Sequence, residues 1–164
     1  MKTPLLLAAL ALFATSPFSV STAQQFSMDG PAKAKAYVVY AAEPQTIRAG
    51  KPAVLELRFQ VLQGYHVNSH TPKSDLLIPT AVTLQPANGV KPGTLEYPAG
   101  KPYSFSFDPG TKIDVYAGDF IVKLPVVATA GDHTLDGTLR YQACDNASCY
   151  PPRNVPVKIA FTAK

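Results

Sequence analysis

The chain has 164 residues and a formal net charge of +4, from 15 basic and 11 acidic side chains. Because the basic residues are scattered along the sequence rather than clustered, the charge argues against a nucleic-acid-binding surface and against an electrostatic membrane anchor. This length is sufficient for one domain with a core that folds unaided, so a disulfide would be optional for its stability.

Residues 1–23 have the pattern of a secretory signal peptide. Lys2 precedes an apolar run from Leu5 to Ala14, and small residues precede the expected cleavage site after Ala23. The run is too short to cross a bilayer, and no other segment contains the roughly 20 apolar residues of a transmembrane helix. We expect an exported protein without stable membrane insertion, with a flexible lead at 24–35 and a domain over 36–164.

The rest of the chain predicts an all-β fold. The 16 prolines and 10 glycines of the full sequence are spread along it and leave no room for a long helix. Apolar and polar residues alternate most clearly over 53–61, where Leu55, Leu57 and Phe59 share one face. Turn-forming segments such as "PANG" and "DPGT" separate the strands, and their spacing is typical of an immunoglobulin-like β-sandwich. In chain order, the expected strands are 36–41, 53–61, 65–69, 80–85, 103–107, 119–127, 133–143 and 155–162.

The segment "RYQACDNASCYPP" at 140–152 holds both cysteines of the chain, Cys144 and Cys149. In the strand before them, Leu139 and Tyr141 share one parity, and continued alternation places Cys144 on the opposite, polar side. The turn formers "DNAS" are expected to bring Cys149 back toward Cys144. Both sulfurs are therefore expected near the surface.

Two interpretations of this cysteine pair stay open from the residues alone. Paired cysteines of exported proteins usually form stabilising disulfides. The chain-entropy model gives roughly 2 kcal/mol for so short a ring, against about 4 to 5 kcal/mol for a loop of 100 residues. Neighbouring exposed cysteines also suit a dithiol that exchanges with other proteins, although this spacing is less specific than C-x-x-C. The alternatives are a redox protein and a secreted immunoglobulin-like binding module with a local structural disulfide.

The block "YQAC" to "CYPP", with "VPV" after it and "GYHVNSHTP" and "LLIPT" before it, resembles the DsbD N-terminal domain family. This family comprises the amino-terminal periplasmic domains of bacterial thiol:disulfide interchange proteins, and the resemblance extends from about Tyr37 to Phe161. It implies an immunoglobulin-like fold and dithiol-disulfide exchange in the periplasm, with no cofactor besides a redox-active Cys144–Cys149 disulfide. It further implies that Cys149 forms the mixed disulfide with partners and that Cys144 resolves it.

The resemblance also implies the partners of such a domain. Electrons come from a thioredoxin-like domain, itself fed through a membrane-embedded electron transporter. They pass to thioredoxin-like periplasmic proteins such as disulfide isomerase and cytochrome-maturation thiol proteins. Because the sequence contains neither a membrane domain nor a thioredoxin-like domain, we expect a stand-alone shuttle reduced by separate proteins, or a relative that has lost the relay.

Members of the family carry a cap loop in which an aromatic residue shields the cysteines. The segment "DVYAGDF" matches that loop most closely, which makes Tyr116 the expected cap residue and Asp114 its acidic neighbour. The family also has tyrosines near the cysteines, and Tyr141 and Tyr150 flank them in this sequence.

Two histidines suggest a second, weaker hypothesis. His66 and His70 would share one face if "YHVNSH" at 65–70 is a strand, as in a copper or zinc site. Two ligands are too few, and no acidic cluster lies beside them in the sequence. A structural or surface role is therefore favoured for both residues.

Overall fold

The computed structural model describes residues 36–106 and 108–164. This part of the chain contains twelve β-strands and no α-helix, which confirms the all-β prediction. Consistently, the described residues include no helix long and apolar enough to span a membrane. The expected signal peptide at 1–23 and lead at 24–35 lie outside the described residues.

One four-stranded sheet is antiparallel throughout. Its strands, in spatial order, are β1 (Val38–Ala41), β3 (Ala53–Val61), β9 (Asp119–Ala128) and β6 (Val90–Pro92). The register of β3 against β9 places Leu55 opposite Leu124 and Phe59 opposite Phe120. Because side chains alternate across a strand, these pairs lie on one face of the sheet.

The second sheet contains the longest pairing of the molecule. Its strands, in spatial order, are β2 (Gln45–Ile47), β12 (Arg153–Ala163), β10 (Gly131–Tyr141) and β5 (Ala81–Leu84). Strands β10 and β12 pair antiparallel along their whole length, whereas β2 runs parallel to the end of β12.

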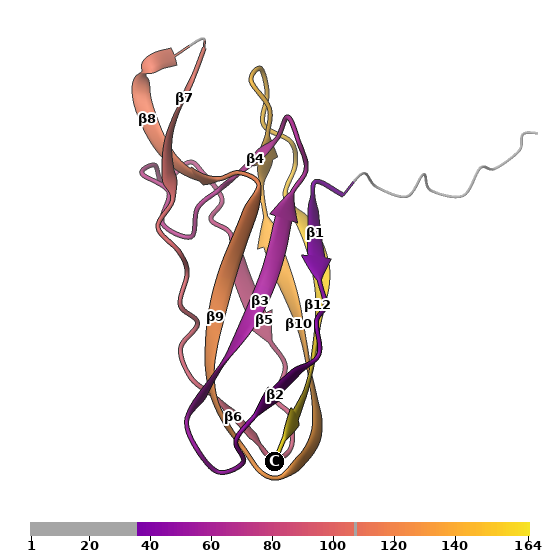
Figure 1. Ribbon diagram of the computed structural model, residues 1–164. Coiled ribbons are helices and arrows are strands. Elements are labelled where there is room, and N and C mark those ends of the chain that lie inside the picture. The colour runs from indigo at the N-terminus through magenta and orange to yellow at the C-terminus, as the bar shows by residue number, and fades with distance from the viewer. Residues whose placement is uncertain (1–35, 107) are drawn as a thin grey trace, which may run out of the picture. The chain divides into compact units, whose positions relative to one another are not determined.

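A single hydrophobic core joins these two sheets, so they form the predicted sandwich (Figure 1). Inward-facing residues of β3, β9, β10 and β12 are almost completely buried, as the period of two in each strand requires. The residues at its centre are Leu55, Leu57, Phe59, Val122, Leu124, Leu135, Leu139, Tyr141, Val157 and Ile159.

A third sheet lies at one end of the domain and carries the cysteines. Its strands, in spatial order, are β11 (Ala143–Cys144), β4 (His66–Asn68), β8 (Asp108–Tyr116) and β7 (Lys101–Phe105). The β7–β8 hairpin projects from that end in Figure 1. This sheet therefore brings a long hairpin and the cysteine segment to the same region.

Every strand expected from periodicity is found, with small differences at the ends. Strands β2, β6 and β8 were not expected. Strands β2 and β6 each have three residues, which are too few to show an alternation. The segment "DPGT", expected as a turn, instead begins β8. All of the first five residues of β8 are exposed, so this half of the strand has no apolar face for the sequence to reveal.

Candidate redox site

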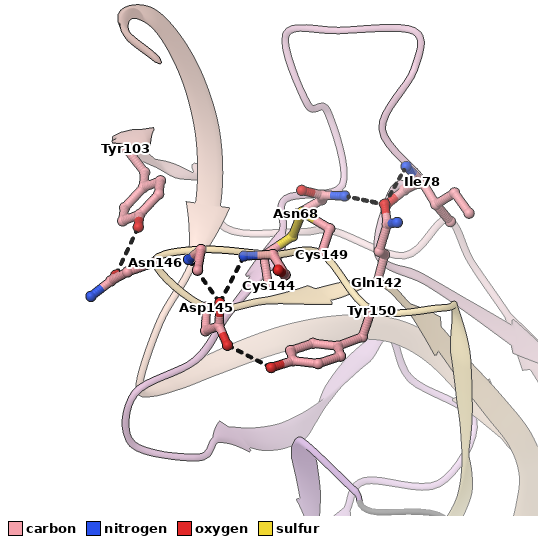
Figure 2. Close-up of a disulfide and its surroundings, with 11 residues drawn as sticks. Asn68, Ile78, Tyr103, Gln142, Cys144, Asp145, Asn146, Cys149 and Tyr150 are labelled. Carbon is pink, nitrogen blue, oxygen red and sulfur yellow. Dashed lines mark hydrogen bonds between the residues drawn. A yellow bond between two sulfur atoms is a disulfide. The ribbon is translucent and has the colours of Figure 1, made fainter. Parts of the chain in front are cut away.

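The chain changes sheets at Gln142, immediately before the cysteines. Strand β10 ends at Tyr141 in the second sheet, and β11 begins at Ala143 in the third sheet. The Gln142 side-chain oxygen accepts hydrogen bonds from the Asn68 amide, at 3.1 Å, and from the Ile78 backbone N–H, at 3.3 Å (Figure 2). These contacts hold Gln142 at a break between β10 and β11. Beyond this break the alternation of inward- and outward-facing side chains begins anew.

The break decides where the two sulfur-bearing residues lie. Cys144 is fully buried, at 0% exposure, whereas Cys149 is exposed. The expectation that both sulfurs lie near the surface is therefore wrong for Cys144. It assumed that the parity of β10 continues past Gln142, and a change of sheet cancels that parity.

Cys144 and Cys149 form a disulfide across a very short hairpin. Their Cα atoms are 4.0 Å apart, as suits residues that face each other as a non-hydrogen-bonded antiparallel pair. Backbone hydrogen bonds lie on both sides of the pair, from Tyr150 to Ala143 at 2.8 Å and from Asp145 to Ser148 at 2.9 Å. The two cysteines are thus held opposite each other by the backbone as well as by the S–S bond.

Asp145 organises the tip of this hairpin, the cysteine loop of residues 145–148. Its Oδ1 accepts hydrogen bonds from the backbone N–H groups of Ala147 and Ser148, each at 2.8 Å. Its Oδ2 accepts one from the Tyr150 hydroxyl at 2.5 Å (Figure 2). These bonds, the one from Tyr150 foremost, lower the pKa of Asp145, and the same contact raises the pKa of Tyr150 to about 12. The carboxylate and the phenol therefore both stay in the forms that hold the loop.

An aromatic cluster lies behind Tyr150. The Tyr150 ring stacks on Tyr37, with 4.9 Å between centroids, and Tyr37 in turn lies 4.7 Å from Tyr65. The Arg153 guanidinium lies 5.7 Å from the centre of the Tyr37 ring, as in a cation–π contact. Sequence reasoning missed Tyr37, Tyr65 and Arg153, since only the fold brings these distant segments together.

The β7–β8 hairpin contacts the cysteine loop on another side. The Tyr103 hydroxyl donates a hydrogen bond to the Asn146 side chain at 3.0 Å, and the Ser106 hydroxyl donates one to the Asn146 carbonyl at 3.4 Å. In Figure 2 the Tyr103 side chain points toward Asn146 from outside the loop. The hairpin is thus bound to the loop beside the disulfide by side chains that sequence reasoning did not single out.

His66 lies beneath this hairpin. It is opposite Cys144 in the register of β4 and β11, and only 4% of its surface is exposed. Its ring packs against Tyr103 with 4.0 Å between centroids. Burial lowers the pKa of His66, and the nearby Asp145 carboxylate offsets part of that effect. The imidazole is therefore neutral at neutral pH.

The hydrogen bonds, ring stacking and ion pair of Tyr116 and Asp114 are with residues other than the two cysteines. Tyr116 is buried at the end of β8, and its ring stacks on Phe120 at 4.6 Å. Its hydroxyl donates to the Pro98 carbonyl at 2.9 Å. Asp114 forms an ion pair with Lys73 at 3.1 Å. The cap role of Tyr116 stays a prediction from the resemblance, but the residue that reaches the cysteine loop from this sheet is Tyr103.

Of the two tyrosines that flank the cysteines, only Tyr150 lies at the loop. Tyr141 is fully buried, and its hydroxyl accepts a hydrogen bond of 3.1 Å from the Tyr37 backbone N–H. It supports the strand that leads to Cys144. Tyr150 binds the loop directly, as described above.

His66 and His70 pack against different tyrosines. The His70 ring stacks on Tyr97 at 3.7 Å, and its Nδ1 lies 2.9 Å from the Thr80 carbonyl oxygen. In the part of the chain that the structure describes, no group of three or more His, Cys, Asp or Glu residues is placed to hold a metal ion. The metal hypothesis thus gains no support from these residues.

The family model of the N-terminal region of thiol:disulfide interchange protein DsbD matches residues 33–160. This chain belongs to the DsbD N-terminal domain family. The resemblance carried by the cysteine block is thereby confirmed, and with it the immunoglobulin-like fold class. Membership of the DsbD N-terminal family, together with the Cys144–Cys149 disulfide, supports thiol-disulfide interchange in general terms.

Solved structures of a DsbD N-terminal domain and of a ScsB domain are similar to the chain. The reduced DsbD N-terminal domain of Neisseria meningitidis is 21% identical, with a TM-score of 0.43 over 66% of this chain and 77% of that one. The structure of the complex between the DsbD and PilB N-terminal domains of the same organism is 20% identical to this chain. Its TM-score is 0.44, over 64% of this chain and 73% of that one. The N-terminal periplasmic domain of ScsB from Proteus mirabilis is 12% identical, with a TM-score of 0.50, and this chain covers 44% of it. No match was found among the curated proteins.

Proposed function

We propose that this protein is a periplasmic thiol-disulfide oxidoreductase. Its Cys144–Cys149 pair would carry electrons from a thioredoxin-like or membrane-embedded donor to oxidised periplasmic proteins. The observation that carries the proposal is the asymmetry of the pair, in which Cys149 is exposed and Cys144 is fully buried. A partner can reach Cys149, whereas Cys144 is shielded and is available for the second, intramolecular step of the exchange.

The proposed reaction begins with the reduced pair. The Cys149 thiolate attacks a disulfide sulfur of the oxidised partner, so that a mixed disulfide forms and one partner thiolate leaves. Cys144 then attacks the Cys149 sulfur, the bond between Cys149 and the partner breaks, and the partner leaves with both electrons. A donor dithiol regenerates the pair by attacking Cys149 and displacing Cys144 as a thiolate.

The β7–β8 hairpin is the element that we propose to cover the site between reactions. Tyr103 and Ser106 bind Asn146 in the cysteine loop, so a partner that docks on the loop must displace these contacts. The described residues contain no helix whose N-terminus could lower a thiol pKa. Reactivity is therefore expected to depend on docking and to be low in the isolated protein.

Trapping of the mixed disulfide tests the order of attack. The Cys144→Ala variant, once reduced, should accumulate a disulfide-linked complex with an oxidised thioredoxin-like domain through Cys149, detected by mass spectrometry. The Cys149→Ala variant is the control and should give no complex, because Cys144 is buried. Trapping in Cys149→Ala alone would reverse the assigned roles.

The reduction potential of the pair separates this function from that of a binding module with a structural disulfide. A shuttle should equilibrate with glutathione and exchange with thioredoxin-like partners. A potential below about −300 mV, with no exchange with any such partner, would identify a structural bond instead. Replacement of both cysteines should abolish electron transfer by a shuttle and leave partner binding by a binding module intact.

The physiological partners and location follow the same proposal. Oxidised disulfide isomerase and cytochrome-maturation thiol proteins are the acceptors that we propose. Fractionation of the native host, with sequencing of the mature N-terminus, should find the protein in the periplasm and its first residue after Ala23. Recovery of the uncut chain from the cytoplasm would contradict this location.

A further inference from the structure

His66 and Cys144 are direct partners across the β4–β11 pair. Residues that face each other in antiparallel strands project from the same face, with Cβ atoms about 4.5 to 5.5 Å apart. Both residues are buried, at 4% and 0% exposure. The imidazole and the Cys144 side chain therefore lie on the same face of this strand pair, and both are shielded from solvent.

The His66 ring is held in place there by aromatic neighbours. Its centroid lies 4.0 Å from that of Tyr103 and 5.7 Å from that of Phe105. Its Nε2 is buried, and among the described residues it has no hydrogen-bond partner. A buried polar atom without a partner is unfavourable and calls for an explanation. In the disulfide form Cys144 has no proton to share, whereas the Cys144 thiol of the reduced form could donate its proton to this nitrogen.

We propose that His66 is the general base for the resolving step, in which it takes the proton of the Cys144 thiol as that sulfur attacks Cys149. This inference rests on the proposed function. In the step, the Cys144–Cys149 bond forms and the bond from Cys149 to the partner breaks. The electron pair of the broken bond leaves on the partner sulfur as a thiolate. The proton stays on the imidazole, which releases it to that thiolate or to solvent.

The environment explains why Cys144 needs a base. A thiol buried among apolar groups has a raised pKa, so little thiolate forms unaided at neutral pH. Burial keeps His66 neutral and able to accept a proton, although Asp145 partly opposes that effect. The titratable groups around the imidazole are Tyr103 on β7 and Cys144 and Asp145 on the cysteine hairpin. The negative charge of Asp145 would stabilise the imidazolium that forms.

The two steps can be timed separately in the reduced protein with the aromatic disulfide dithiobis(nitrobenzoate). Attack by Cys149 releases one coloured nitrothiobenzoate anion, and resolution by Cys144 releases the second. His66→Phe preserves an aromatic ring against Tyr103 but removes the base. We expect an unchanged first phase and a second phase slowed about 100-fold at neutral pH, near the lower end of what general-base catalysis contributes.

The pH profile distinguishes a base from a packing residue. In the wild type the second phase should rise with pH and level off once His66 is neutral, below about pH 6.5. In His66→Phe it should keep rising in proportion to hydroxide well above neutrality. His66→Gln, which keeps a polar side chain of moderate size, should behave like His66→Phe, and it decides the matter if the phenylalanine variant fails to fold.

His133→Phe is the matched control, because His133 also stacks on an aromatic ring, that of Phe161, and belongs to β10 rather than to the cysteine site. It should leave both phases and the pH profile unchanged. Second phases within about twofold of the wild type in His66→Phe and His66→Gln would overturn the role of His66 while leaving the proposed function intact. Failure of the reduced wild type to react through Cys149 with an oxidised thioredoxin-like domain, as well as with this reagent, would instead contradict the proposed function itself.

Discussion

The Tyr150 hydroxyl donates a 2.5 Å hydrogen bond to the Asp145 carboxylate, and these are the residues that directly follow Cys149 and Cys144. The bond therefore joins the same two chain segments as the disulfide, one position further along. Because it does not depend on the oxidation state of the sulfurs, it should keep them close after reduction. Proximity of this kind favours the intramolecular step over loss of the partner to a side reaction.

Titration of Tyr150 tests this contact. The hydrogen bond to Asp145 raises the pKa of Tyr150 from 10.0 to about 12, so the stabilisation is complete below pH 10.0 and is lost as pH rises through about 12. In Asp145→Asn the phenolate absorbance assigned to Tyr150, by difference from Tyr150→Phe, should move back toward pH 10.0. Asp136→Asn, on the exposed face of β10, is the control and should not move it. An identical titration in the wild type and Asp145→Asn would show that the contact is absent in solution.

Removal of the Tyr103 hydroxyl should loosen the β7–β8 hairpin from the cysteine loop. In Tyr103→Phe the hydrogen bond to Asn146 is lost while the ring against His66 remains. One hydrogen bond contributes about 0.5 to 1.5 kcal/mol, so we expect reduction of the disulfide by dithiothreitol to be about 2- to 10-fold faster. Tyr97→Phe, which loses a bond to the Val82 backbone instead, is the control. Equal reduction rates in Tyr103→Phe and the wild type would argue against a covering role for the hairpin.

Tyr116→Phe, in contrast to Tyr103→Phe, should lower the stability of the domain without changing the rate at which the disulfide is reduced. The Tyr116 hydroxyl donates to the Pro98 carbonyl and accepts from the His70 N–H, and both groups would lose this partner. We expect the free energy of unfolding in urea to fall by about 1 to 3 kcal/mol, with an unchanged rate of disulfide reduction. Faster reduction at unchanged stability would instead support the cap role that the family resemblance implies for Tyr116.

Reduction of the disulfide should leave the domain folded. Closure of a ring this short contributes about 2 kcal/mol in the chain-entropy model, and the core of the sandwich does not include the S–S bond. Urea unfolding of the oxidised and reduced wild type measures the difference. The variant that combines Cys144→Ala with Cys149→Ser should match the reduced protein, since alanine puts no polar atom at the buried position. Complete unfolding on reduction would identify the disulfide as a structural bond.

Much of the sandwich could be predicted because its strands have one buried face. In β3, Leu55, Leu57 and Phe59 alternate with exposed or half-buried residues, and β9 and β12 repeat the pattern. The first half of β8 could not be predicted, since it is exposed on both faces and contains the turn formers Pro109 and Gly110. In this half Asp108 lies opposite Phe105 of β7, and the register shifts before Ile113 lies opposite Tyr103, an irregularity that no local pattern in the sequence reveals.

The features of the redox site likewise fall into those that the sequence determines and those that depend on the tertiary structure. The sequence by itself determined that Cys144 and Cys149 are close and form a small ring, because only four residues separate them, and its cysteine block identified the family. Only the tertiary structure decided that Cys144 is buried, since the chain changes sheets at Gln142 and strand parity does not survive such a change. It also decided that His66 and Tyr103 meet beside the cysteines, because β4, β7 and β11 are far apart in the chain and become neighbours only through the pairing of one small sheet.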